Sequence, residues 1–329
     1  LIKSIKIVYL VFAPLPSSAT AGEKSEFKKS KSHPYFFDID IDAKLIGNGK
    51  INLNHKKILF KHFIYNESVF VGEFIYKIES GLSMEAISEK ESINEKIKNL
   101  MMQKFNVKEN LVEEYSVVLI NNPNLSPASL IKARKFILAR LIRAIDEEID
   151  EESANEILGS RIQYSKDDMT IVDWEGAVII AKKGDYESDL ELFKVGNYQL
   201  LKYRLLDAEI DKSLEKLREN PPKNKSLLKS IVKSELEILL DFDKVDQSLL
   251  LVGDWYSAKL YRIIAKEFYL DSWKEIVKNK LDSLKTIEGT IRENLTFSWE
   301  RLYDMVSIIG WAILLIGYFY LYFKDAGLL

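Results

Sequence analysis

The sequence predicts an α+β protein with a mixed α/β domain, a C-terminal helical region and a single transmembrane helix. Short segments rich in Ile, Val, Phe and Tyr dominate the first half, helical spacing of apolar residues dominates the second, and one long segment carries no charge. We therefore expect an α/β domain over residues 1–183, a helical region over 184–304, a transmembrane helix over 305–323 and a short tail over 324–329.

The composition of the 329 residues excludes several classes of protein. Apolar residues make up 47% and charged residues 29%, which is typical of a folded body and excludes wholesale disorder. The formal net charge of −3 supplies no basic field, so direct nucleic-acid binding is not expected. Because the chain has no cysteine, disulfides, Cys-ligated zinc, iron–sulfur clusters and thiol catalysis are excluded.

Strands are expected in the first part of the chain because β-branched and aromatic residues suit a pleated, half-buried surface. Residues 83–105 instead have apolar side chains at helical spacing, so a helix should lie between two of these strands. The expected strands cover residues 6–12, 35–41, 58–65, 68–78 and 115–120.

The first of these strands has an alternative interpretation as part of a secretory signal. Lys3 and Lys6 precede a short apolar segment, and residues 19–21 resemble a signal-peptidase site. Cleavage there would place the body outside the cell. The apolar segment is short, contains Pro14 and alternates as a strand does, so a strand is the preferred interpretation.

Ser126 and Pro127 mark the start of the next helix, because Ser suits the N-cap and Pro suits the first helical position. This helix is expected to run into the acidic segment 146–152. Residues 169–180 follow, and their apolar second half predicts a central strand.

Three helices are expected in the helical region. Pro221 and Pro222 end the first, because proline cannot continue a helix. The second covers residues 227–250, and the third begins near Trp255.

The end of the third helix carries an apolar residue at every third or fourth position, which makes one continuous stripe. This stripe is either intramolecular core or the seam of a coiled coil between chains of a homo-oligomer. The seam would be formed by Val277, Leu281, Leu284 and Ile291.

Residues 305–323, MVSIIGWAILLIGYFYLYF, contain no charged side chain. A helix of this length spans about 28 Å, close to the hydrocarbon thickness of a bilayer. Gly310 and Gly317 lie on one face of it, where small residues allow two helices to pack closely.

The charges beside this segment predict its orientation. Lys285, Arg292 and Arg301 precede it, whereas Lys324 follows it. The positive-inside rule then places the body on the cytoplasmic side of the lipid membrane, or on the matrix-equivalent side in an organelle.

Candidate chemistry is sparse. Asp38, Asp40 and Asp42 would share one face of a strand and are weak candidates for binding Mg²⁺ or Ca²⁺, although an exposed strand face is preferred. Residues 47–50, Gly-Asn-Gly-Lys, lack the spacing of a phosphate loop and should form a turn.

Two acidic residues near the expected central strand raise one further possibility. Asp173 and Glu175 flank Trp174 and could form a carboxylate pair for acid–base chemistry. An exposed strand end is preferred, so neither a catalytic residue nor a cofactor is expected.

Three features together resemble the required-for-meiotic-nuclear-division family, a domain of unknown function. Residues 173–180, DWEGAVII, precede Gly184-Asp185 and a long helix, which is similar to that family's late strand and Gly-Asp turn. Residues 279–284, NKLDSL, resemble its Asn-Arg-Leu-Asp-x-Leu helix. A single apolar helix then follows, as in that family.

The resemblance covers roughly residues 165–325, and the chain departs from the family pattern in two places. The Glu-Trp pair that directly precedes the membrane helix appears here only as Trp299-Glu300, and residues 70–74 align poorly with the early glycine-aromatic strand motif. The resemblance implies a membrane-anchored assembly or scaffold protein, which in mitochondrial members supports organellar translation at the inner membrane. It implies no catalytic residues.

The leading functional hypothesis is therefore a non-enzymatic, membrane-anchored scaffold that forms a homo-oligomer within a larger protein assembly. The alternative is an oligomeric transport protein with an α/β cytoplasmic domain, similar to the large magnesium channels. Those channels have two membrane helices joined by a Gly-Met-Asn loop, whereas this sequence predicts one helix and lacks the loop. A membrane-bound hydrolase or nucleotidyl enzyme has no supporting motif.

Overall fold

The computed structural model forms an α+β fold, as predicted. Contacts divide the chain into two compact units, Leu1–Ala208 with Ile238–Val277 and Glu209–Glu237 with Lys278–Leu329. The predicted boundary at residue 183 stays a prediction. The structure describes residues 2–15, 23–24, 41–105, 111–121, 126–181, 184–219, 233, 236 and 255–325.

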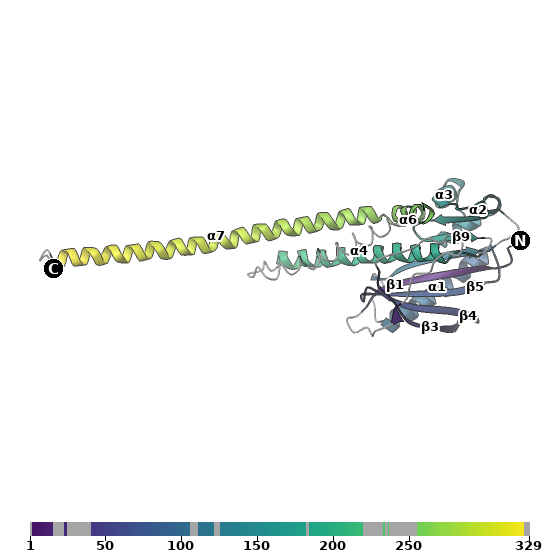
Figure 1. Ribbon diagram of the computed structural model, residues 1–329, viewed down its shortest axis with the longest axis horizontal. Helices are drawn as coiled ribbons and strands as arrows, with labels where there is room; N and C mark the ends of the chain where they lie inside the picture. The colour runs from purple at the N-terminus through teal and green to yellow at the C-terminus, as the bar shows by residue number, and fades with distance from the viewer. Residues whose placement is uncertain are drawn as a thin grey trace. The chain divides into compact units, whose positions relative to one another are not determined.

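The first unit is built on one mixed sheet (Figure 1), whose strands lie in the order β2-β3-β4-β5-β1-β6-β9-β8-β7. Neighbouring strands are antiparallel, except that β6 and β9 are parallel. The strands are β1 (Ile5–Pro14), β2 (Glu23–Lys24), β3 (Ala43–Leu53), β4 (Lys56–Tyr65), β5 (Val69–Ile78), β6 (Glu113–Ile120), β7 (Arg161–Ile162), β8 (Asp168–Val172) and β9 (Gly176–Ala181).

Strand β1 lies in the middle of this sheet, between β5 and β6. Residues 7–12 are each at most 1% exposed, so the strand is covered on both faces. A strand buried on both faces has a nearly continuous apolar sequence, which is also what a signal peptide has. The strand prediction is confirmed, and cleavage after residue 21 would remove the centre of the sheet.

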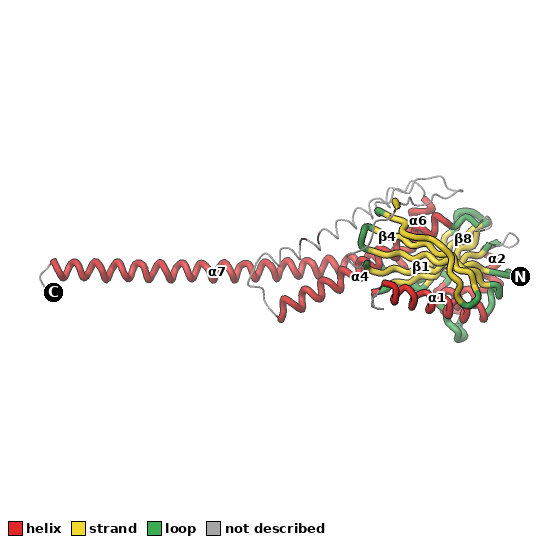
Figure 2. Tube along the Cα trace, turned by 90° about the horizontal axis from the view of Figure 1, so that it is seen from below, coloured by secondary structure: helices red, strands yellow, loops and turns green. Residues whose placement is uncertain are grey.

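Helices cover both faces of the sheet. On one face, α1 (Met84–Phe105), α2 (Pro127–Arg143) and α3 (Glu151–Ile157) share a hydrophobic core with the strands. On the other face lie α6 (Trp255–Glu267) and the first part of α4 (Glu187–Glu219), whose Phe193 stacks on Tyr115 of β6 at 5.4 Å between ring centroids. Figure 2 shows α1 and α6 on opposite sides of the strands.

The turn predicted at residues 47–50 is wrong, because these residues lie within β3. A Cβ on Gly49 would come within 2.9 Å of the Phe60 ring on β4, so glycine here makes room for a cross-strand aromatic side chain. The chain reverses instead at Asn54 and His55, whose φ angles of 51° and 59° are those of a tight hairpin turn.

Two expectations about residues 126–180 need correction. Helix α2 begins at the predicted N-cap Ser126, but it ends at Arg143 because Ala144 adopts a left-handed conformation, and Asp150 then caps α3. The acidic segment is therefore a connection with a short helix. The expected central strand is confirmed as β9, and a separate strand, β8, precedes it.

The helix predicted from Trp255 onward is two helices, α6 and α7 (Leu270–Asp325), because Tyr269 has a φ of 53° between them. In the second unit, Lys280 of α7 forms an ion pair with Asp211 of α4 at 2.7 Å. The expected helix 227–250 and strand 35–41 lie almost wholly outside the described residues.

Candidate functional site

One segment of α7 is long and apolar enough to cross a membrane. Leu302–Tyr322 has a mean hydropathy of 1.9, and none of its most apolar window is buried in the structure. Ile308, Trp311 and Leu314 are each about two-thirds exposed or more, at 68%, 70% and 67%. Apolar surface on this scale is unfavourable in water, because each fully exposed large side chain forgoes about 1.5–3 kcal/mol of burial.

The predicted contact residues of this helix remain open to a partner. A Cβ built on Gly310 or Gly317 would meet no atom within 4 Å. Close packing of two such helices through these glycines therefore stays a prediction.

The predicted oligomer seam lies in the same helix, on the N-terminal side of this apolar segment. Val277, Leu281 and Leu284 are at most 1% exposed within the single chain, and the side chain of Ile291 lies outside the described residues. These three side chains are thus buried without a second chain. A seam between chains stays a prediction.

Arg143, the last residue of α2, forms an ion pair with Asp173, in the turn between β8 and β9. Arg143 donates from Nε to Oδ2 at 3.0 Å and from Nη2 to Oδ1 at 2.8 Å. Hydrogen bonds to Asp173 are the main cause that raises the pKa of Arg143 above its usual value. Nη2 also donates to Glu156 of α3 at 3.3 Å, so one guanidinium joins three elements.

This arrangement corrects the prediction of an exposed strand end at Asp173, which is only 3% exposed. Its carboxylate is bound in a bidentate ion pair, whereas Glu175 is exposed. The two residues therefore do not form an acid–base pair. Sequence reasoning missed the ion pair because thirty positions separate Arg143 from Asp173.

Two cavities border Arg143. The larger, of about 770 Å³, lies against α3 and α6 and has side chains of both charges around it, including Arg262, Lys266 and Asp271. The smaller, of about 490 Å³, lies where β6 and β9 begin and is lined by several glutamates. Both volumes are within the range of small-molecule sites.

Several charged groups at the smaller cavity serve the fold. Glu113 is paired with Arg204, and Glu114 accepts hydrogen bonds from Lys98 and Tyr9. Among the described residues, no group of three His, Asp or Glu side chains has the arrangement of a metal site.

Lys90 is buried beside this cavity, and desolvation is the main cause that lowers its pKa to about 8. A lysine of this kind can act as a nucleophile. Here its Nζ donates to the backbone oxygens of Leu141 and Ile142 at 2.7 and 3.3 Å. It therefore satisfies the last carbonyls of α2, which a helix leaves without internal partners.

A second buried network lies under α4. Lys194 is 2% exposed, and its Nζ lies 2.5 Å from Glu73 of β5 and 3.0 Å from Glu191. Burial alone would lower the pKa of Lys194, but the two carboxylates outweigh it and raise the pKa above its usual value. This cluster fixes α4 on the sheet.

Asp189 lies near the start of α4 and accepts hydrogen bonds from Thr170 at 2.5 Å and Tyr256 at 2.9 Å. Burial raises the pKa of Asp189 to about 6. The three side chains connect α4, β8 and α6, so this network also has a clear structural role.

The weak metal candidates are only partly described. Asp38 and Asp40 lie outside the described residues, and Asp42 lies 3.4 Å from the Nζ of Lys44. Cation binding by the three carboxylates therefore stays a prediction.

Comparison with known proteins places these features in context. Residues 68–187 match a family model described as Uncharacterized protein MJ0711, N-terminal domain. Uncharacterized protein MJ0711 of Methanocaldococcus jannaschii is 28% identical over 255 residues, which cover 75% of this chain and 77% of that protein. No solved structure matches the chain.

The matched segment runs from β5 to the start of α4 and includes the Arg143–Asp173 ion pair. These similarities support a relation to a family of unknown function. They do not confirm the resemblance to the required-for-meiotic-nuclear-division family. Over most of its length, the chain is thus similar to an uncharacterized archaeal protein.

Proposed function

We propose that the protein is a membrane-anchored, non-enzymatic scaffold or assembly factor whose α+β body is held at a bilayer by Leu302–Tyr322. The observation that carries this proposal is that every residue of that apolar segment is exposed in the folded chain. In a bilayer the same side chains would lie in hydrocarbon, and a helix satisfies all of its backbone polar groups there.

The chemistry of the body supports a scaffold. Asp173, Glu73 and Lys194 are buried and Arg143 is half-buried, and all four are bound in ion pairs that join helices to the sheet. The pKa values of Lys90 and Asp189 are shifted towards neutrality, and hydrogen bonds to neutral groups hold both: Lys90 donates to backbone oxygens of α2, and Asp189 accepts from the hydroxyls of Thr170 and Tyr256. These groups use their charge to position elements.

The anchor is tested with three forms of the protein in a vesicle-flotation and carbonate-extraction assay. The full chain should float with phosphatidylcholine vesicles and resist carbonate, and a chain without residues 305–329 should do neither. The variant Ile308→Lys with Leu314→Lys should lose insertion, because a lysine near the centre of a membrane helix costs about 2.5–3.5 kcal/mol. A truncated chain that still resists carbonate would show that the anchor is elsewhere.

A thermal-shift screen of the same truncated chain with divalent cations and nucleotides tests the non-enzymatic part of the proposal. A scaffold predicts no shift in melting temperature, whereas a transport protein or nucleotidyl enzyme predicts one. Sizing of the full chain in detergent tests the homo-oligomer, and a stable monomer would contradict both the oligomer and the transport alternative.

The orientation also belongs to this proposal. Lys285, Arg292 and Arg301 precede the anchor, so the body should lie on the cytoplasmic or matrix-equivalent side. A reporter fused after the last residue should then be exposed on the opposite side of the membrane.

A further inference from the structure

A basic cavity of about 780 Å³ lies on the surface formed by α2, α3 and the strands β7 and β8. It has no part in the networks around Arg143 and Lys194. Four cations line it, and Glu151 is the one acidic side chain among its described lining residues. The four are Lys132, Arg134, Lys135 and Arg161.

Three of these cations are available to a ligand. Lys135 forms an ion pair with Glu151 at 3.0 Å. Within the described part of the chain, Lys132, Arg134 and Arg161 form no ion pair. The cavity therefore carries a net positive charge although the whole chain is slightly acidic.

Helix α2 is irregular where it borders this cavity. Arg134 has φ −135° and ψ 26°, which are not helical values, so α2 is kinked there. The consecutive residues 131–137 all contribute to the lining of the cavity. Phe136, which is 47% exposed, lies among the cations, and the Nζ of Lys135 lies 6.0 Å from its ring centroid.

Cations around a half-exposed aromatic ring are suited to the interface of an anionic membrane. The cations attract acidic headgroups, and the ring has a favourable place at the boundary between headgroups and acyl chains. A nucleic acid is a poorer match, because proteins that bind it usually neutralise six to ten phosphates along an extended track.

We propose that this basic cavity docks the body on the anionic headgroup layer of the bilayer in which the protein is anchored. This inference rests on the proposed function, since the bilayer that holds the anchor is taken as the source of the anionic headgroups. Each cation near an anionic surface should favour the docked state about fivefold.

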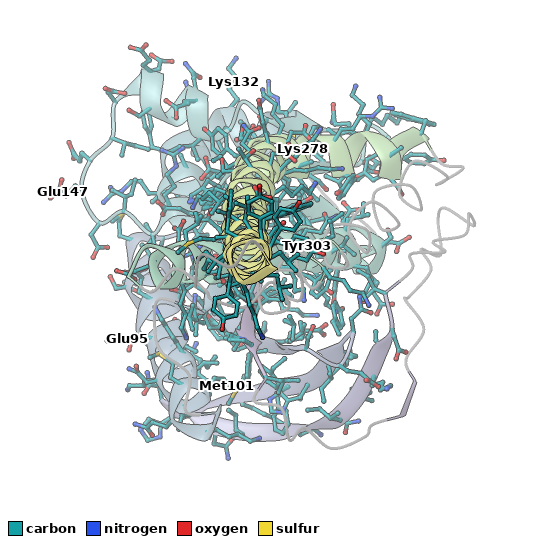
Figure 3. All side chains as sticks on the ribbon, turned by 90° about the vertical axis from the view of Figure 1, so that its left-hand side faces the viewer. Glu95, Met101, Lys132, Glu147, Lys278 and Tyr303 are labelled. Atoms are coloured by element: carbon teal, nitrogen blue, oxygen red, sulfur yellow. The ribbon has the colours of Figure 1, made fainter. Side chains whose placement is uncertain are left out.

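The absence of cysteine allows a site-specific test on the full chain. Ala133→Cys, an exposed position that lines the cavity, is labelled with an environment-sensitive fluorophore, and Glu95→Cys on α1 serves as the control site. Figure 3 shows Lys132 and Glu95 on well-separated parts of the first unit. The protein is reconstituted in nanodiscs of phosphatidylcholine alone or of an equimolar mixture with phosphatidylglycerol.

A lipid-borne quencher should reach the label at position 133 in the anionic discs only. It should not reach the label at position 95 in either kind of disc. Lys132→Glu with Arg134→Glu should lower the docked-to-undocked ratio at least about tenfold. The matched control Lys50→Glu with Lys57→Glu changes the charge equally on exposed positions of β3 and β4, and should leave the ratio unchanged.

The other outcomes each overturn the proposal. Equal quenching in neutral discs would remove the role of charge. A fluorescence change with inorganic phosphate in neutral discs would identify a soluble anion, and displacement by a short RNA would identify nucleic acid as the occupant. If the chain floats with neutral vesicles but the label at position 133 is not quenched in anionic discs, only the docking is refuted. If the chain does not float, the anchor and the docking are refuted together.

Discussion

Replacement of Lys194 by methionine should destabilise the first unit strongly. It should also reverse the contribution of Glu73 to the pH dependence of that unit's stability. In the folded chain the ammonium group lies between Glu73 and Glu191 and 5.1 Å from the Phe63 ring centroid. Methionine fills a similar volume, so the main change is the loss of a buried positive charge. Glu73, itself 3% exposed, would then lack its shortest ionic contact.

The size of the effect follows from this geometry. Removing one partner of a buried pair costs about 3–5 kcal/mol, because the other charge stays desolvated. Lys61 also contacts Glu73 at 3.3 Å, but its side chain is 37% exposed and compensates only in part. We therefore expect a loss of about 3 kcal/mol in the free energy of unfolding at pH 7.

The pH dependence provides the sharper signature. Burial acts to raise the pKa of Glu73, but Lys194 and Lys61 outweigh it, so the pKa of the folded carboxyl lies below its usual value of 4.5. Its contribution to stability is present above pH 4.5 and is lost as the pH falls through the folded pKa. Without Lys194, burial should raise the pKa above 4.5, so the penalty of the variant should shrink as the pH falls from 7 to 5.

Urea unfolding of the chain without residues 305–329, followed by circular dichroism, measures both quantities. Glu73→Gln in the Lys194→Met background should recover about 1–2 kcal/mol, because it removes the unpaired charge. Lys77→Met, whose ion pair with Glu79 is mostly exposed, is the matched control and should change stability by less than about 0.5 kcal/mol. A Lys194→Met loss below about 1 kcal/mol, or one that grows on acidification, would refute the reasoning.

Four further variants test other parts of the structure. Burial is the main cause that lowers the pKa of His62 to about 4, so the protonation of His62 should reduce the stability of the wild-type chain by about 2–3 kcal/mol between pH 6.5 and 4. His62→Phe should remove this contribution to the pH dependence. Parallel curves of stability against pH for the wild-type chain and the variant would contradict the prediction. Gly196→Ala places a Cβ 2.5 Å from the side chain of Ile264 and should lower the free energy of unfolding in urea by about 1–2 kcal/mol. A Cβ on Gly289 would meet no atom within 4 Å, so Gly289→Ala should stabilise α7 by up to about 1 kcal/mol. Leu281→Asp with Leu284→Asp should reduce the helical dichroism of the chain, because both side chains are buried within it; an intact dichroism with a smaller size in detergent would instead support the oligomer seam.

The elements that could be predicted from the sequence are those specified by local composition and spacing. Segments rich in Ile, Val, Phe and Tyr located β1, β4, β5 and β6, and the Ser126-Pro127 pair located the start of α2. Strand β3 was missed because its Gly-Asn-Gly segment has the composition of a turn, whereas Gly49 leaves room for the Phe60 ring on β4. The real turn uses Asn54 and His55, and histidine is not a typical turn residue.

The polar networks could not be predicted, because their members are far apart in the chain. Lys194 meets Glu73 only after α4 has packed on the sheet, and Arg143 meets Asp173 only after β8 and β9 have paired. A charged side chain within an otherwise apolar pattern looks like a solvent-exposed position. The one available signal was weak: in α4, Lys194 lies between the buried residues Phe193 and Val195.

The order of the strands shows that the segment matched to the family model cannot form this sheet alone. Residues 68–187 contain β5 and β6, but these strands do not pair with each other, because β1 lies between them. Without β1 the segment would have two unpaired edges of buried, apolar strands, an arrangement that promotes aggregation. The same segment also lacks nearly all of α4, which supplies Lys194 to the buried carboxylate on β5. The folding unit that carries the matched segment must therefore include the N-terminal strand and the first part of α4.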